Sequence, residues 1–273
     1  MLIEVDNIID EIKAEISSLK EKVPYEPKLV SLVVEPDEST KSYLNSQKRN
    51  AKKFGINLEI VESNDLTNDL RKYNEDDDTD AIFIARPLKK GYTELDIAKY
   101  INPEKDVEGV SLHNIGSMFY EKELFVPCTA EAVVKIIEDT TDVRGKNIVI
   151  LGRSTTVGKP AAIMLQRHGR DATVTVTHTK TNNLKEVTKK ADVLVAAIGK
   201  ANFVDSTFVK EGMIVIDVGI NVVDGKIVGD VNKDVSEICQ LTPVPGGVGS
   251  VTTAILMRNV FRAANNRKGD MQL

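Results

Sequence analysis

Two series of short apolar runs, separated by amphipathic stretches, are the feature that most restricts how this chain can fold. The first series predicts strands and helices in alternation, with strands over 28–34, 57–61 and 80–85 and helices over 8–19, 39–54 and 66–73. Strand segments such as AIFIA (81–85) are apolar throughout, which indicates burial on both faces. This alternation predicts an α/β fold with a parallel sheet covered by helices on both sides. The acidic run 75–80 is expected to be a solvated loop.

The second series follows a helix predicted over 127–137 and a break at VRGKN (143–147). It predicts strands over 148–151, 173–177, 193–198 and 214–218 and helices over 157–168 and 184–189. The segment PVPGGVGS (243–250) then opens a last helix that is expected to pack back on the first series. Because 273 residues exceed most single cores, we expect two domains. They are an N-terminal α/β domain over 1–127, joined by the C-terminal helix 251–273, and a Rossmann-type parallel-sheet domain over 128–250.

The charge balance argues against nucleic acid or an anionic membrane as the main partner. Both reward a basic surface, whereas this chain has a net charge of -5. No apolar run reaches the roughly 18 residues of a bilayer span, and the first residues, MLIEVDNIIDEI, carry acids where a secretory signal carries lysines. We therefore expect a globular protein of the cytoplasm.

No metal site is expected from the cysteines and histidines. Cys128 and Cys239 form no ligand-spaced pair, and His113, His168 and His178 are scattered along the chain. We interpret both cysteines as small apolar core residues.

The stretch ILGRSTTVGKP (150–160) forms a glycine turn between a predicted strand and a predicted helix. In doubly wound sheets this is where nucleotides bind, because backbone N–H groups and the positive end of the helix face the crevice beyond the strand ends. Gly152 allows a sharp turn, and Gly158 lets the helix approach the sheet or a pyrophosphate. The spacing is not GxGxxG, so this stretch alone leaves both phosphate binding and a plain turn open.

The residues at the end of the next predicted strand, 173–177, indicate whether the cofactor is NAD or NADP. NAD-selective sites carry an acid there that bonds the ribose hydroxyls, but this chain reads THTKT (177–181). With Arg153 in the turn and Lys180 opposite, the local charge suits a 2'-phosphate, which predicts NADP. The alternative is that both are ordinary surface residues.

Several segments, in order along the chain, resemble the methylenetetrahydrofolate dehydrogenase/cyclohydrolase family. They are SYLNSQKRNAKKFGI, INPEKDVEG, the PCT of FVPCT, GRSTTVGKP, ADVLVAAIGK, GMIVIDVGIN, GKIVGDV and TPVPGGVGSVT. The resemblance implies oxidation of 5,10-methylenetetrahydrofolate to the methenyl form with a nicotinamide cofactor, followed by hydrolysis to 10-formyltetrahydrofolate. It also implies a folate-binding first domain, a Rossmann second domain and a homodimer.

The resemblance assigns roles to five residues of the second domain. Gly152, Arg153 and Ser154 would hold the cofactor phosphates. Thr179 would lie near the 2'-phosphate, and Ile220 would touch the nicotinamide half.

In the first domain, Tyr43 and Gln47 lie four residues apart on a predicted helix and therefore share a face. The resemblance implies that Tyr43 stacks on the pterin, although simple packing remains an alternative. The family carries a lysine at the position of Gln47 and credits it with acid/base and electrostatic work in the hydrolytic step. An amide supplies neither a charge nor a proton near neutral pH, so we expect dehydrogenation to survive this change better than hydrolysis.

Further departures from the family pattern lie nearby. Ala85 replaces a glutamine, Arg86 replaces an apolar residue, and Glu108 replaces the aspartate placed against the pterin. Glu108 is expected to contact the pterin, with a solvated acid as the alternative. Our hypothesis is that Arg86 or Lys48 restores positive charge to the site; Lys48 lies about 100° round the helix from Gln47.

Three functions remain open on the sequence. The first is an NADP-dependent dehydrogenase that also has cyclohydrolase activity. The others are a dehydrogenase-only relative, and a nucleotide-binding structural or regulatory subunit without turnover.

Overall fold

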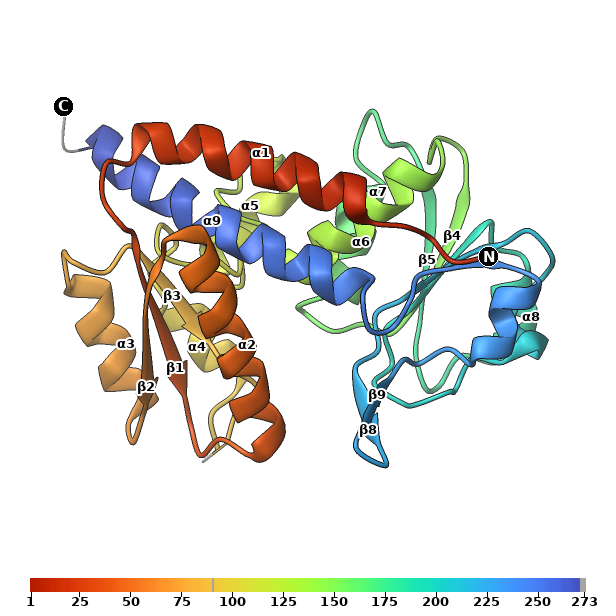
Figure 1. Ribbon diagram of the computed structural model, residues 1–273. Coiled ribbons are helices and arrows are strands. Elements are labelled where there is room, and N and C mark those ends of the chain that lie inside the picture. The colour runs from red at the N-terminus through yellow and green to blue at the C-terminus, as the bar shows by residue number, and fades with distance from the viewer. Residues whose placement is uncertain (90, 271–273) are drawn as a thin grey trace. The chain divides into compact units, whose positions relative to one another are not determined.

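Parallel sheets flanked by helices form both units of the chain (Figure 1). The computed structural model describes residues 1–89 and 91–270. The three-stranded unit comprises Glu11–Cys128 with Thr253–Leu273, and the five-stranded unit comprises Met1–Asp10 with Thr129–Thr252. The predicted α/β class and the parallel sheets are confirmed.

The sheet of the three-stranded unit has the order β2-β1-β3. Its strands are β1 (Lys28–Val33), β2 (Asn57–Glu62) and β3 (Ala81–Ile84), all parallel. Its helices are α2 (Glu38–Phe54), α3 (Leu66–Glu75), α4 (Glu94–Tyr100), α5 (Leu112–Ser117) and the 3-10 turn Met118–Tyr120. The short helices α4 and α5 were not predicted.

Alternate residues of β1 face different layers of helices. Val30 and Leu32 join a core with Leu66 and Leu70 of α3. Ser31 points the other way, because its hydroxyl donates to Gln47 of α2. The central strand therefore contributes an apolar face to the core and one polar group to the α2 side.

The C-terminal helix α9 (Val248–Asp270) packs beside α1 (Asp6–Lys22), as Figure 1 shows. Arg258 Nη1 lies 3.5 Å from Glu15 Oε2, and Lys20 Nζ lies 5.5 Å from the centre of the Phe261 ring. The predicted return of this helix is confirmed. No helix in residues 1–89 and 91–270 is both long and apolar enough to cross a bilayer.

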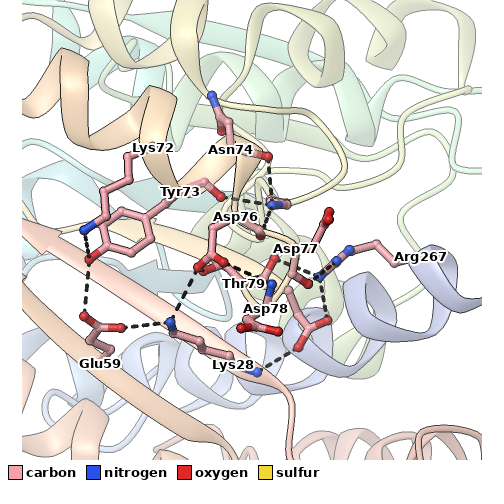
Figure 2. A network of polar contacts seen from close by, with 12 residues as sticks. Lys28, Glu59, Lys72, Tyr73, Asn74, Asp76, Asp77, Asp78, Thr79 and Arg267 are labelled. Atoms are coloured by element: carbon pink, nitrogen blue, oxygen red, sulfur yellow. Dashed lines mark hydrogen bonds and ion pairs between the residues drawn. The ribbon is translucent and has the colours of Figure 1, made fainter.

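The acidic run 75–80 is not the fully solvated loop that was predicted, because cations from three segments hold it (Figure 2). Arg267 Nη1 donates to the Thr79 carbonyl and, at 2.9 Å, to Asp80 Oδ1. Lys105 Nζ donates to the carbonyls of Tyr73, Asn74 and Asp76, and Lys28 pairs with Asp76 at 3.5 Å. Thr79 and Asp80 are buried, whereas the carboxylates between them and α3 stay largely exposed.

The sheet of the five-stranded unit has the order β10-β7-β6-β4-β5 and is parallel. Its strands are β4 (Asn147–Leu151), β5 (Thr173–Thr177), β6 (Val193–Ala196), β7 (Ile214–Asp217) and β10 (Gln240–Leu241). Its helices are α6 (Cys128–Thr140), α7 (Gly158–Leu165), α8 (Leu184–Lys189) and the 3-10 turns Ser206–Phe208 and Lys233–Glu237. Helix α7 ends three residues before the predicted 168, where the chain turns ahead of Gly169.

An antiparallel hairpin, β8 (Asn221–Val223) with β9 (Lys226–Val228), projects from this unit. Asp224 and Gly225 form its two-residue turn, both with positive φ, as such turns require. The hairpin was not predicted.

Candidate active site

The glycine turn lies where the strand order of the five-stranded sheet reverses. From β4 the chain first adds β5 on one side and then β6 on the other. The crevice beyond the carboxyl ends of two such strands is the usual ligand position in open α/β sheets. Gly152 follows β4 directly at this point.

Close backbone contacts explain both glycines of the turn. Gly152 has a φ of 118°, and a Cβ there would lie 2.2 Å from the Ala197 carbonyl oxygen after β6. A Cβ at Gly158 would lie 2.2 Å from the Gly152 carbonyl oxygen. Gly158 thus lets α7 approach the turn itself, which holds strand, turn and helix in one fixed arrangement.

Residues predicted to contact the cofactor lie at the ends of neighbouring strands. Leu151 pairs with Thr177, and the Gly152 N–H donates to the Thr177 carbonyl at 3.2 Å. Arg153 and Ser154 after β4 and Thr179 after β5 are exposed at this edge. Ser154 Oγ also accepts from the N–H groups of Val157 and Gly158, at 3.1 and 3.4 Å, so it links the turn to the first residue of α7.

Ile220 follows β7, two strands away from β4 in the sheet. Its side chain is 67% exposed and therefore available to a ligand. Its Cδ1 would be 3.7 Å from a Cβ at Gly249, so it lies beside the start of α9.

In the three-stranded unit, Tyr43 of α2 stacks on Phe83 of β3, with ring centres 5.8 Å apart and an interplanar angle of 25°. The residue is nevertheless 43% exposed, so packing uses only part of the ring. Although part of the ring is exposed, burial of its hydroxyl end raises the pKa of Tyr43 above its ordinary value, and the nearby Glu108 carboxylate raises it further. The hydroxyl therefore stays protonated near neutral pH.

Gln47 is 2% exposed, one turn after Tyr43 on α2. Its Oε1 accepts from Ser31 Oγ at 2.8 Å. Within the described chain, its Nε2 has no hydrogen-bond partner. A buried amide donor left unpaired costs about 1–3 kcal/mol, so this group would gain from an acceptor.

An ion cluster beyond β3 joins Arg86, Glu94 and Glu108. Arg86 Nη1 lies 2.6 Å from Glu108 Oε2, and its Nη2 lies 3.0 Å from Glu94 Oε2. Arg86 Nη1 also donates to the Ile84 carbonyl at 2.7 Å, which fixes the guanidinium at the strand end. Burial acts to lower the pKa of Arg86, but the carboxylates of Glu108 and Glu94 outweigh it and raise this pKa above its ordinary value.

Two other residues named from the sequence are Ala85, a departure from the family pattern, and Lys48, the alternative cation. Ala85 is buried and offers no polar atom. Lys48 is exposed on α2 although its neighbour Gln47 is buried, as the 100° step round a helix predicts. The geometry therefore favours Arg86 over Lys48 as the cation next to Glu108.

Two family models match the chain. The tetrahydrofolate dehydrogenase/cyclohydrolase catalytic domain matches residues 4–108, and the NAD(P)-binding domain of the same family matches residues 127–268. The chain belongs to the tetrahydrofolate dehydrogenase/cyclohydrolase family. The resemblance stated from the sequence motifs is confirmed.

Relatives of this family cover the chain almost completely. The bifunctional protein FolD of Petrotoga mobilis is 98% identical over 273 residues, which is 100% of both chains. The bifunctional 5,10-methylenetetrahydrofolate dehydrogenase/cyclohydrolase of Thermoplasma acidophilum has a TM-score of 0.89 at 32% identity, covering 98% of this chain and 100% of its own. The Trypanosoma brucei enzyme, solved with NADP and an inhibitor, has a TM-score of 0.86 at 28% identity, covering 98% of each chain. The NAD(P)-binding domain and this complex support NADP as the cofactor.

Sequence reasoning missed two buried aspartates in family segments that it had quoted only as likenesses. Asp217 at the end of β7 accepts from the Gly219 and Asp230 N–H groups at 2.9 Å and from Val231 at 3.0 Å. Burial raises the pKa of Asp217 to about 6, although these backbone donors act to lower it. The Asp217 carboxylate joins β7 to the segment after β9.

Asp230 organises the loop after β6. Its Oδ2 accepts from the Ile198 and Gly199 N–H groups at 2.7 and 2.9 Å, and its Oδ1 accepts from Lys200 at 2.9 Å. Asn221 Nδ2 also donates to Oδ1 at 2.9 Å. The Asp230 carboxylate therefore fixes the conformation of the loop that follows β6, at the point where the strand order reverses.

Proposed function

We propose that this protein oxidises 5,10-methylenetetrahydrofolate to the methenyl form with NADP and hydrolyses the product to 10-formyltetrahydrofolate. The observation that carries this proposal is that one chain holds both the catalytic and the NAD(P)-binding domain of the family. The catalytic domain supplies the aromatic ring of Tyr43, the carboxylate of Glu108 and the amide of Gln47. The NAD(P)-binding domain supplies the glycine turn at the point where the strand order reverses.

We propose the following roles for the residues of the catalytic domain. Tyr43 stacks on the pterin through its exposed surface, while Phe83 supports the ring. Glu108 contacts the pterin. Gln47 orients the substrate through the Nε2 donor that has no partner within the described chain. Hydride transfer needs mainly this positioning, because NADP supplies the electron chemistry when bound.

In the NAD(P)-binding domain we propose that Gly152, Arg153 and Ser154 hold the cofactor phosphates. Thr179 lies near the 2'-phosphate, and Ile220 contacts the nicotinamide half. The residues present fit NADP, because exposed Arg153 and Lys180 follow adjacent strands and the segment 177–181 has no acid.

Replacing Arg153 and Lys180 together by serine is expected to weaken NADP binding at least about 10-fold more than it weakens NAD binding, because only NADP carries the 2'-phosphate. A charged hydrogen bond contributes about 1.5–3 kcal/mol, and 1.4 kcal/mol is a factor of about 10 in Kd. Titration calorimetry with each cofactor measures this. Lys159→Ser, an exposed lysine on α7, is the matched control. Equal losses for NADP and NAD would show that the two residues do not read the 2'-phosphate.

A single absorbance trace tests the activity. With methylenetetrahydrofolate and NADP, the methenyl form is expected to appear and then disappear faster than it hydrolyses spontaneously. Accumulation of the methenyl form would identify a dehydrogenase-only enzyme, the alternative favoured by uncharged Gln47. Cofactor binding without turnover would identify a nucleotide-binding subunit.

We also propose a cytoplasmic homodimer whose folate-binding domain is 1–127 with 251–273 and whose NADP-binding domain is 128–250. Within the first range, residues 1–10 pack with the five-stranded unit, and residues 271–273 lie outside the described chain. The hairpin β8–β9 supports self-association, since Val222 and Ile227 are 61% and 48% exposed. Sedimentation equilibrium tests this against the 30.0 kDa monomer.

A further inference from the structure

The ion cluster beyond β3 contains two carboxylates in different bonding states. Glu94 uses both oxygens on Arg86, with Oε1 3.2 Å from Nε and Oε2 3.0 Å from Nη2. Glu108 uses only Oε2, which accepts from Arg86 Nη1 at 2.6 Å and from the Ile84 N–H at 3.4 Å. Among residues 1–89 and 91–270, no donor bonds Glu108 Oε1. Both Glu94 oxygens are therefore engaged by Arg86, whereas Glu108 has one oxygen available to a ligand or water.

The hydrolytic step needs a group that accepts a proton from water. Tyr43 is unsuitable as such a base because burial raises its pKa. Gln47 has no titratable group, and Arg86 stays protonated beside its two carboxylates. Among these residues only the carboxylates remain, and Glu108 is the one with an unbonded oxygen.

We propose that Glu108 is the proton acceptor of the hydrolytic step and that Arg86 is the residue that positions it. This inference rests on the proposed function. Glu108 thereby takes over proton transfer that Gln47 cannot perform, and Arg86 holds Oε2 so that Oε1 faces the reacting water.

The step balances as follows for the cationic methenyl substrate. The water oxygen bonds to the carbon between the two ring-closing nitrogens N5 and N10, the C=N π electrons move to nitrogen, and Glu108 takes one water proton. Glu108 then returns that proton to N5 as the C–N5 bond breaks. The hydroxyl proton leaves to solvent as the formyl C=O forms, so each turnover consumes one water and releases one proton.

The charges around Glu108 set the pH at which it can accept a proton. Burial raises its pKa above the ordinary value, and the Asp106 carboxylate raises it further. The ion pair with Arg86 opposes both and keeps Glu108 ionised at a lower pH than burial alone would allow. Among the described residues, Tyr43 from α2, Cys128 of α6 near Tyr43, and Glu94 from α4 also carry titratable groups in this region. Loss of the Arg86 charge must therefore move the pKa of Glu108 upward.

The test measures kcat and KM against pH for both activities, the dehydrogenase with NADP and the hydrolysis with methenyltetrahydrofolate. Glu108→Gln is expected to lower the hydrolysis kcat about 100-fold or more, the usual contribution of a general base, and to abolish its decline at low pH. The dehydrogenase kcat is expected to fall less than about 10-fold, because hydride transfer needs no base here. Arg86→Gln is expected to shift the low-pH decline of hydrolysis to higher pH.

Two further variants keep the result interpretable. Glu108→Asp retains a carboxylate and is expected to restore a low-pH decline in hydrolysis kcat, which a purely structural loss would not do. Arg71→Gln, an exposed arginine of α3, is expected to leave both profiles unchanged.

Three results would overturn the inference. The first is that the hydrolysis kcat of Glu108→Gln matches that of the wild type. The second is that Glu108→Gln lowers both activities equally and only by raising KM. The third is that the pH profile of hydrolysis in Arg86→Gln shows no shift. A wild-type protein with neither activity would instead refute the proposed function itself.

Discussion

Replacing Gly152 by alanine is expected to destabilise the five-stranded unit by at least about 3 kcal/mol and to abolish NADP binding. The new Cβ would lie 2.2 Å from the Ala197 carbonyl oxygen, and the φ of 118° is strained for any residue with a side chain. Relief requires β4 and β6 to separate at their carboxyl ends, where the cofactor is proposed to bind. Urea unfolding gives the free energy, and titration calorimetry gives the NADP affinity.

Gly212→Ala is the matched control for this prediction. Gly212 also has a positive φ, 75°, but nothing lies within 4 Å of the Cβ position. It is therefore expected to cost only about 1–2 kcal/mol, from backbone conformation alone. If both variants lost the same stability and Gly152→Ala bound NADP normally, the close approach to Ala197 would not matter.

Asp230→Ala is expected to cost about 3–5 kcal/mol and to weaken NADP binding more than 10-fold. Three backbone N–H groups of residues 198–200 and the Asn221 amide would lose an acceptor that is itself fully buried, and each lost bond to a charged group is costly. The loop after β6 would then lose its fixed position beside the glycine turn. Thermal unfolding with and without NADP separates the loss of stability from the loss of binding.

Asp205→Ala provides the comparison for Asp230. The Asp205 carboxylate also accepts a backbone N–H, from Thr207 at 2.8 Å, but at an exposed turn. Its removal is expected to cost about 1 kcal/mol and to leave NADP affinity unchanged. A similar loss in both variants would mean that the several buried bonds to Asp230 add nothing beyond an ordinary cap.

Local patterns predicted the elements of the fold well because each depends on neighbouring residues. The strand Thr173–Thr177 and the helix Leu184–Lys189 were predicted with the bounds that the structure shows. The hairpin β8–β9 was missed because its strands have three residues each, although Asp224-Gly225 is a strong hairpin signal between the apolar pairs.

The candidate site was predictable in its members but not in their bonding. The sequence marked Gln47, Arg86 and Glu108 as departures from the family. It did not reveal that Arg86 and Glu108, 22 positions apart, form an ion pair, or that Ser31 of the central strand holds Gln47. The roles of Asp217 and Asp230 were missed for the same reason, because a carboxylate that binds distant backbone N–H groups produces no periodic pattern in the sequence.

Both units are assembled from segments at opposite ends of the polypeptide. The Ile3 N–H donates to the Leu241 carbonyl at 2.9 Å in the five-stranded unit, while Arg258 and Arg267 bond Glu15 and Asp80 in the other. During translation, Glu11–Cys128 leaves the ribosome long before α9, the helix that completes its unit. The first ten residues likewise pair with β10, a strand that is made more than two hundred codons later. A nascent chain therefore carries two incomplete cores until α9 has been made, and we expect neither Glu11–Cys128 nor Thr129–Thr252 to fold stably alone.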